Sequence, residues 1–234
     1  MLLSDFNYHL PPELIAQEQA VPRDSARLML INRTTGAISH HHVYDLPALL
    51  PQDYFIVANN TKVFPARILG HKSSGPARNA AHSAAGGGKV EVLLTQPLGQ
   101  SRYKCIARPG LKVGDVILFP APVPKRSDLV GHPTRSDLEG QITSIHDIER
   151  TIKFNLEEST LRTTLSTIGT MPTPPYIKKL LGNSADYQTI YAKYGFSAAA
   201  PTAGLHFTPS LLNKIKANHS WNELTLNVGL GTFL

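Results

Sequence analysis

The first seventy residues alternate between short apolar runs and polar turns, a pattern that predicts strands. Residues 28–31 and 38–43 flank a Thr-Thr-Gly sequence and predict a strand, a turn and a second strand. Residues 45–50 indicate a short helix that ends before Pro51. Residues 54–58 are almost continuously apolar, which is typical of a strand buried on both faces in an α/β protein. A sheet is therefore expected to begin here.

After a polar turn at residues 59–61 and a further strand at 63–69, the pattern changes. Residues 71–88 are rich in Ser, Ala and Gly and predict a mobile loop, and the Pro-rich, basic residues 120–137 predict a second one. Apolar runs without helical periodicity predict five more strands, at residues 89–95, 102–107, 116–119, 141–145 and 151–156. Their spacing favours a small antiparallel barrel or sandwich.

Helical signals return after the last of these strands. Asn155 and Glu158 have the spacing of a capping box in front of a helix. That helix would bury Leu161, Leu165 and Ile168 on one face. The Met-Pro-Thr-Pro-Pro sequence that follows must be extended, because each proline restricts the residue before it.

Two further helices and a strand are expected near the end of the chain. Ser184 can cap a helix that reaches Tyr191. Thr208 and Pro209 form a strong pair of cap and first-turn residues for the next helix. Alternation at residues 224–228 predicts a strand.

The order of these elements predicts an α/β body, a mixed sheet with helices, that is interrupted by an inserted antiparallel β-barrel domain. Residues 1–70 would form the first part of the body, residues 71–156 the barrel, and residues 157–234 the second part. A length of 234 residues suffices for one large domain or two small ones, each with a buried core.

Composition and charge narrow the class of protein. Hydrophobic residues make up 41% of the chain, too many for wholesale disorder, and no apolar run approaches the roughly 18 residues of a membrane helix. The first residues lack a basic stretch followed by an apolar core, so we expect a cytoplasmic protein without a secretory signal. A net charge of +6 favours a polyanionic partner, nucleic acid first.

The residue types also exclude several kinds of chemistry. The single Cys105 rules out an internal disulfide, and its alternating surroundings favour a buried apolar role. A phosphate-binding P-loop is excluded, because Gly88 and Lys89 are followed by Val90. The consecutive histidines at residues 40–42 lie in one predicted strand and would point to opposite faces, so no metal site is expected there.

Two segments carry candidate chemistry. Residues 200–208 (APTAGLHFT) combine small residues with His206 just before a helix start, where an anion can bind. Residues 171–179 (MPTPPYIKK) place an aromatic ring and two cations on a stiff segment, which suits base stacking and phosphate contact. The residues alone leave open whether each segment is only a connector.

Ten segments in order, covering nearly the whole chain, resemble one enzyme family. They are SDF (4–6), LPPELIAQ (10–17), PRDSARL (22–28), NTKVFPAR (60–67), GKVEVLL (88–94), RPG (108–110), MPTPPYIK (171–178), DYQTIYAK (186–193), residues 200–208 and VGLGTF (228–233). In these segments the chain resembles S-adenosylmethionine:tRNA ribosyltransferase-isomerase, an enzyme of queuosine biosynthesis. The resemblance implies an α/β body with an inserted β-barrel, in agreement with the elements above.

It also implies a reaction. The ribosyl part of S-adenosylmethionine would be transferred to, and isomerised on, the aminomethyl group of a deazaguanine base in a tRNA anticodon. The product would be epoxyqueuosine, with adenine and methionine released. S-adenosylmethionine is then a co-substrate, tRNA is the partner, and neither a metal nor a membrane takes part. We expect a monomer.

The same resemblance gives the candidate residues their expected roles. The catalytic candidates are His206, Lys178 and Tyr176, with His206 first for proton transfer. Backbone donors of the cofactor pocket would come from Thr202, Gly204, Gly229, Gly231 and Thr232. Contacts to RNA phosphates or a carboxylate would come from Arg23, Arg27, Lys62, Arg67 and Arg108. A base or adenine could stack on Tyr187 or Tyr191.

The chain departs from the family at three positions and in length. Asn60 stands where the family usually has Asp, Lys62 where it has Arg, and Asn227 where it commonly has His. Family members continue past the GLGTF motif, so we expect the catalytic body to be incomplete at the C-terminus. Two alternatives stay open: a truncated or degenerate relative that binds RNA without catalysis, and a plain S-adenosylmethionine-binding protein unrelated to RNA.

Overall fold

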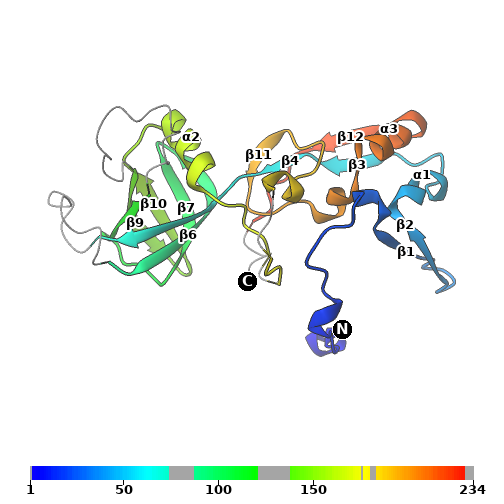
Figure 1. The fold of residues 1–234 in the computed structure, drawn as a ribbon, viewed down its shortest axis with the longest axis horizontal. Helices are drawn as coiled ribbons and strands as arrows, with labels where there is room; N and C mark the ends of the chain where they lie inside the picture. Colours follow the sequence, from blue (N-terminus) through cyan, green and yellow to red (C-terminus); the bar gives the residue numbers. More distant parts are fainter. Residues whose placement is uncertain (1, 74–86, 121–137, 175, 180–182, 230–234) are drawn as a thin grey trace.

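The structure is a computed structural model that describes residues 2–73, 87–120, 138–174, 176–179 and 183–229. It confirms the predicted fold class, with parallel strands and helices in one part of the molecule and a closed antiparallel barrel in the other (Figure 1). The two predicted loops fall largely on residues 74–86 and 121–137, outside the described ranges. Within those ranges, no helix is both long and apolar enough to cross a bilayer.

The first two strands of the body form an antiparallel hairpin, as the apolar runs in the sequence predicted. β1 (Arg27–Ile31) pairs with β2 (Ile38–His42). The side chain of Asn32 accepts hydrogen bonds from the backbone N–H groups of Thr34 and Thr35, each at 3.0 Å, and so stabilises the turn. Three short 3₁₀ helices precede the hairpin: η1 (Leu3–Phe6), η2 (Pro12–Leu14) and η3 (Arg23–Ser25).

Two pairs of parallel strands form the rest of the body's sheet structure. β3 (Ile56–Asn59) pairs with β12 (Trp221–Leu224), and β4 (Thr61–Val63) pairs with β11 (Tyr194–Ser197). The prediction of one continuous strand over residues 63–69 is wrong, because β4 ends at Val63 and a separate strand begins at Arg67. Pro65 has no N–H to offer to a ladder, so β4 ends before it and the next strand starts after it.

The predicted strand at residues 224–228 is also misplaced, since β12 ends at Leu224. The backbone beyond β12 bonds to a side chain instead of continuing the ladder. The amide of Asn59 donates to the carbonyl of Leu226 at 2.9 Å and accepts from its N–H at 3.0 Å. These two bonds satisfy the backbone groups that a strand partner would otherwise have taken.

One helix covers the parallel pair β3–β12. In α3 (Pro209–Asn218), the hydroxyl of Thr208 accepts the N–H of Leu211 at 3.2 Å, which confirms the predicted cap. Leu211 and Ile215 are buried against Val43. Shorter helical elements complete this side: η4 (Val43–Asp45), α1 (Leu46–Leu49) and η8 (Thr202–His206).

The expectation that residues 54–58 are buried on both faces is wrong. Ile56 packs against the α3 cluster, but Val57, on the other face of β3, is 52% exposed, and Tyr54 and Phe55 are 56% and 66% exposed. The reason is that β12 is the single sheet neighbour of β3, and no element within the described part of the chain covers its second face.

A closed six-stranded barrel follows, and it confirms the predicted antiparallel strands. Its order is β10-β7-β6-β5-β8-β9. The strands are β5 (Arg67–Lys72), β6 (Lys89–Gly99), β7 (Arg102–Arg108), β8 (Val116–Phe119), β9 (Leu138–His146) and β10 (Glu149–Phe154). His71 and Lys72, predicted in a loop, thus belong to a strand. Cys105 is fully buried in the barrel core, where burial raises the pKa of its thiol to about 12.

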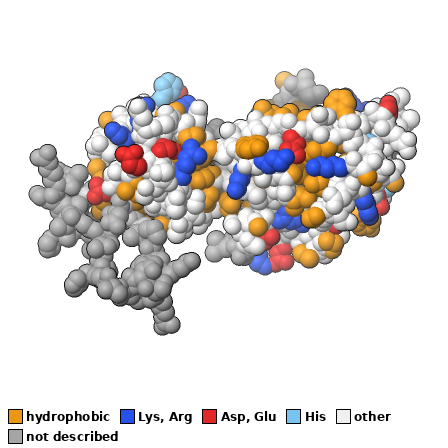
Figure 2. Space-filling model, turned by 90° about the horizontal axis from the view of Figure 1, so that it is seen from above, with side chains coloured by type: hydrophobic (Ala, Val, Ile, Leu, Met, Phe, Trp, Pro, Cys, Tyr) orange, Lys and Arg blue, Asp and Glu red, His pale blue; other side chains and the backbone are white. Residues whose placement is uncertain are grey.

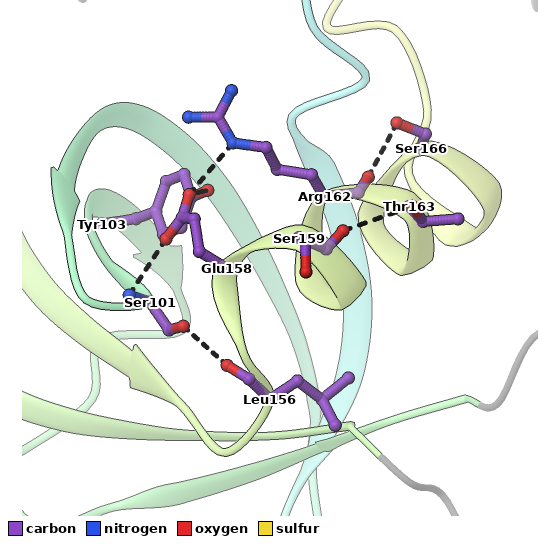
Figure 3. Close-up of polar contacts among 8 residues, drawn as sticks. All are labelled: Ser101, Tyr103, Leu156, Glu158, Ser159, Arg162, Thr163 and Ser166. Atoms are coloured by element: carbon purple, nitrogen blue, oxygen red, sulfur yellow. Dashed lines mark hydrogen bonds and ion pairs between the residues drawn. The ribbon is translucent and has the colours of Figure 1, made fainter.

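Helix α2 (Glu158–Ile168) closes one end of the barrel, with Leu161 and Leu165 in the barrel core. The predicted capping box is wrong, because Asn155 accepts the N–H of Glu139 at 2.9 Å and does not cap the helix. The carboxylate of Glu158 reaches the β6–β7 turn instead (Figure 3). It accepts hydrogen bonds from the N–H of Ser101 at 3.0 Å, the hydroxyl of Tyr103 at 2.7 Å and the guanidinium of Arg162 at 3.1 Å.

The chain enters and leaves the barrel side by side. Arg67 and Thr170 exchange backbone hydrogen bonds of 3.2 and 2.8 Å. Phe196, from β11 of the body, stacks on Phe64 with ring centroids 4.4 Å apart and packs against Tyr103 of the barrel. The barrel and the body therefore share one hydrophobic contact around this ring.

The predicted helix after Ser184 is only the 3₁₀ turn η7 (Ser184–Tyr187), capped by the side chain of Asn183. It ends at Tyr187 because the next residue bonds elsewhere. The side chain of Gln188 accepts the N–H of Val63 at 2.9 Å and donates to its carbonyl at 3.1 Å. Gln188 thus extends the edge of β4 and draws the chain away from a helical path.

Candidate active site

A pocket of about 740 Å³ lies on the body, where three segments distant in sequence meet. Residues 16–23 form the first wall, and the η8 region with Thr202, Leu205 and Thr208 forms the third. The second wall, between them, is formed by Thr173, Pro174, Tyr176, Ile177, Lys179, Asp186 and Tyr187. Its volume lies within the range of small-molecule sites. Four residues singled out from the sequence line it: Arg23, Tyr176, Tyr187 and Thr202.

Gln17 holds the first two walls together. Its amide nitrogen donates to the carbonyl of Tyr176 at 3.0 Å, and its amide oxygen accepts the N–H of Lys178 at 2.8 Å. One side chain therefore pairs with the backbone on both sides of residue 177, as a strand partner would. The Tyr176 backbone is fixed, while its side chain is 52% exposed.

Arg23 anchors the first wall to η7. Its two terminal nitrogens donate to the carbonyls of Gln188 at 2.9 Å and Ala185 at 2.8 Å, and the guanidinium lies 3.6 Å from the carboxylate of Asp186. The side-chain amide of Gln19 also donates to the carbonyl of Asp186. The guanidinium is thus engaged by the chain itself, so the geometry gives Arg23 a positioning role.

A second ion pair closes the rim of the pocket. The ammonium group of Lys179 contacts the carboxylate of Glu18, and this hydrogen bond holds the pKa of Glu18 below its usual range. Together with Arg23 and Asp186, the charged side chains that line the pocket sum to zero net charge.

The floor of the pocket is the buried ring of Tyr187, which packs in a small core with Val63 and Ala200. Tyr191 lies deeper, in edge contact with Phe207 and Trp221. Burial raises the pKa of both tyrosines. The chain's own side chains therefore enclose both rings proposed for stacking.

Gly204 of the 200–208 segment is required by close packing. A Cβ atom at this position would lie 2.1 Å from the hydroxyl of Tyr191 and 2.9 Å from Cγ2 of Thr189. The turn η8 can therefore lie against Tyr191 only without a side chain here. His206 is exposed two residues before the α3 cap and is not part of the pocket wall.

The remaining candidates are spread over the molecule. Lys178, Arg27 and Lys62 are exposed, and Gly229 is exposed beyond β12. Arg67 lies 3.6 Å from the carboxylate of Glu91, with a terminal nitrogen 3.4 Å from the carbonyl of Thr173 in the pocket wall. Arg108 lines a separate cavity of about 710 Å³ at the barrel. Gly231 and Thr232 lie outside the described residues.

Asn227 and Asn60 take structural roles beside the site. The side-chain oxygen of Asn227 accepts the hydroxyl of Thr61 at 2.7 Å and the N–H of Phe196 at 3.1 Å. Gly195 stands against it at a φ of +112°, where a Cβ would lie 2.4 Å from that oxygen. Asn60 donates to the carboxylate of Glu223. In the described ranges, no group of three or more His, Cys, Asp or Glu could hold a metal ion.

The sequence pattern gave no role to Gln17 or Gln188. Gln17 stands in a segment that carried the resemblance, and its amide can donate and accept at once. That property alone does not indicate a partner 159 residues away. Gln188 stands in another such segment, and nothing local distinguishes it from an exposed polar residue. Lys179, one of the two cations predicted to suit phosphate contact, lies in the ion pair with Glu18.

Comparison with known proteins identifies the family. The model of the family described as "Queuosine biosynthesis protein" matches residues 3–234. A curated S-adenosylmethionine:tRNA ribosyltransferase-isomerase from Symbiobacterium thermophilum is 41% identical over 239 residues, covering 100% of this chain and 62% of that protein. The enzyme of the same name from Fusobacterium nucleatum is 39% identical over 234 residues, covering 99% of this chain and 60% of that protein.

A solved structure also matches, the S-adenosylmethionine tRNA ribosyltransferase from Thermotoga maritima. It has 27% sequence identity and a TM-score of 0.35, and the match covers 96% of this chain and 58% of that one. The chain spans about 60% of the length of the curated relatives it matches. On the family match over nearly all of its residues, the chain belongs to the queuosine biosynthesis protein family.

Proposed function

We propose that the protein transfers and isomerises the ribosyl part of S-adenosylmethionine onto the aminomethyl-deazaguanine base of a tRNA anticodon. The product is epoxyqueuosine, with adenine and methionine as the leaving products. S-adenosylmethionine acts as co-substrate without a metal, in a cytoplasmic monomer. The observation that carries the proposal is identity of about 40%, over the whole chain, to enzymes with this name.

The surface of the molecule supports a polyanionic partner. Lys and Arg side chains gather along the middle of one face, across both the barrel and the body (Figure 2). In this proposal Arg27, Lys62, Arg67 and Arg108 contact RNA phosphates, because long basic side chains neutralise the backbone and release counterions. Arg23 positions the pocket wall through its two carbonyl partners. In this proposal residues 1–70 and 157–234 belong to the body and residues 71–156 to the barrel domain, except that the barrel strand β5 already begins at Arg67 and that α2 packs into the barrel core.

The nucleophile is an amine on the RNA, which is protonated in water near neutral pH, so the protein must provide for loss of a proton. His206 is proposed for that proton transfer, with Lys178 and Tyr176 as further catalytic residues. Thr202, Gly204, Gly229, Gly231 and Thr232 shape the co-substrate pocket with backbone donors. Tyr187 and Tyr191 support the pocket from beneath. The pocket that Thr202 lines has a volume of about 740 Å³, within the range of sites that bind small molecules such as this co-substrate.

The direct test is release of adenine from S-adenosylmethionine in the presence of tRNA that carries the deazaguanine precursor, measured on the full natural protein. We expect turnover that depends on both substrates. Protein that binds this tRNA without adenine release would instead be a degenerate RNA-binding relative, and the proposal would be wrong.

The role of His206 has its own test. We expect His206→Ala to slow adenine release by about a hundredfold or more, because a positioned acid or base contributes on this order. His40→Ala is the matched control, since His40 is exposed on β2. Unchanged turnover in His206→Ala would remove His206 from the chemistry and leave the reaction itself standing.

A further inference from the structure

Side chains join the first wall of the pocket to the second. In the described part of the chain, no backbone–backbone hydrogen bond links residues 16–23 to residues 173–188. The links that the structure shows are the amides of Gln17 and Gln19, the guanidinium of Arg23 and the ion pair of Glu18 with Lys179. The relative position of the two walls therefore depends on a few side chains.

These side chains hold different parts of the second wall. Gln19 and Arg23 bind carbonyls in or beside η7. Within the described ranges, Gln17 is the one residue of the first wall that binds the backbone of residues 176–178. The Glu18–Lys179 pair lies beside it, but both side chains are more than half-exposed, and an exposed ion pair stabilises little. The position of residues 176–178 against the first wall therefore depends mainly on Gln17.

The amide of Gln17 uses both of its donor hydrogens and its acceptor. Its nitrogen donates to the carbonyl of Tyr176 at 3.0 Å and to that of Ile15, in its own segment, at 3.2 Å. Its oxygen accepts the N–H of Lys178 at 2.8 Å. Among the amino acids, glutamine and the shorter asparagine supply two such hydrogens together with an acceptor. The contact is therefore specific for an amide.

The two residues bound by this amide carry two of the proposed catalytic groups, the side chains of Tyr176 and Lys178. Between them, Ile177 is half-buried in the pocket wall, and its N–H donates to the carbonyl of Pro174 at 3.0 Å. A turn of the second wall thus holds this stretch on one side, and Gln17 holds it on the other. Loss of the Gln17 contacts would move both groups together, and a displacement of about 1 Å can cost about a hundredfold in rate.

We propose that Gln17 is a positioning residue for the reaction, which sets Tyr176 and Lys178 relative to the first wall of the pocket and acts through them. The inference rests on the proposed function, in which these two residues are catalytic. It deepens that function by naming the group that fixes their geometry.

The geometry is tested without turnover, by amide hydrogen exchange of the full natural protein. Gln17→Met keeps the length of the side chain and removes its amide. We expect the N–H of Lys178 to exchange about tenfold faster in this variant, because its acceptor is gone, while the N–H of Leu211 in the α3 cap keeps its rate. Gln52→Met is the matched control, since Gln52 is exposed and does not line the pocket. Unchanged exchange at Lys178 would overturn the proposal.

The positioning role is tested by steady-state adenine release. Misplacement of a group that acts in the transition state lowers kcat and kcat/KM alike. We expect Gln17→Met to lower both by about tenfold, with the KM values for S-adenosylmethionine and tRNA changed by less than about twofold. A raised KM with unchanged kcat would contradict the proposal, because Gln17 would then act by direct contact with substrate.

A double-mutant cycle separates positioning from a merely structural role. Gln17→Met is added to a chain that already carries Tyr176→Ala and Lys178→Ala, and adenine release is measured with enzyme in excess, so that slow chemistry is resolved. If Gln17 acts through these two residues, the added cost should fall to less than about twofold. The same tenfold cost in both chains would overturn the proposal. Thermal unfolding confirms that each variant is folded.

This proposal and the proposed reaction fail separately. A wild-type protein that releases no adenine contradicts the reaction, and the exchange rate of the Lys178 N–H still decides whether Gln17 holds the second wall. Equal turnover of wild type and Gln17→Met contradicts the positioning role alone.

Discussion

The side-chain amide of Asn60 donates a hydrogen bond to Oε2 of Glu223 at 3.1 Å, between the β3–β4 corner and strand β12. The same carboxylate accepts the ammonium of Lys193 at 2.6 Å and the indole N–H of Trp221 at 3.0 Å. The oxygen of the Asn60 amide accepts the hydroxyl of Thr225 at 2.6 Å. Asn60 is therefore used both as donor and as acceptor, which an aspartate cannot match when ionised.

We predict that Asn60→Asp lowers the free energy of unfolding by about 1–3 kcal/mol at pH 7, because it sets a second carboxylate against Glu223. Repulsion by Glu223 raises the pKa of the new carboxyl at position 60 in the folded state. The loss of stability should therefore shrink as the pH falls through this pKa. Urea unfolding at pH 7 and pH 4 measures it. Asn222→Asp adds the same charge on exposed β12 and should cost little; equal losses in both variants would contradict the prediction.

Glu223 should also make stability depend on pH. Hydrogen bonds from Lys193 and Asn60 lower the pKa of Glu223 from 4.5 to about 2, so its contribution is present above pH 4.5 and is lost as the pH falls toward 2. We expect Glu223→Gln to cost about 2 kcal/mol at pH 6 and much less at pH 2.5. A difference between the two proteins that stays constant over this range, in urea unfolding, would exclude the carboxylate as the source.

Close packing at Gly204 gives a third prediction. Gly204→Ala should destabilise the protein by about 1–3 kcal/mol, because the new Cβ meets the Tyr191 hydroxyl. Tyr191→Phe in the same chain removes that oxygen and should recover part of the loss in thermal unfolding. Gly88→Ala serves as control, since a Cβ there meets no atom within 4 Å. Absence of any recovery would place the conflict at Thr189 instead.

The contact between α2 and the barrel gives a fourth prediction. Burial raises the pKa of Glu158, but hydrogen bonds from Tyr103, Arg162 and Ser101 outweigh it and hold the pKa below its ordinary value. Tyr103→Phe and Glu158→Gln, alone and combined, should show a coupling of about 1–2 kcal/mol in denaturant unfolding. Additive losses would mean that the 2.7 Å bond contributes nothing of its own.

The barrel strands could be predicted because alternation of apolar and polar residues is a local property of a strand with one buried face. Thr208 was predictable as a cap for the same reason, since its partner Leu211 is three residues away. Asn155 failed as a cap because the nearest competing partner, the backbone of Glu139, is brought there by the barrel. The local sequence pattern around Asn155 carries no information about that contact.

The candidate site was likewise predictable only in part. Sequence alone drew attention to Tyr176, Thr202, Arg23 and Tyr187, all of which line the pocket. It could not indicate that Arg23 binds carbonyls 162 and 165 residues away, or that both ion pairs cancel the charge of the wall. Element type follows from neighbours along the chain, so the sequence by itself determined it. The neutral pocket depends on which distant segments meet, so only the tertiary structure decided it.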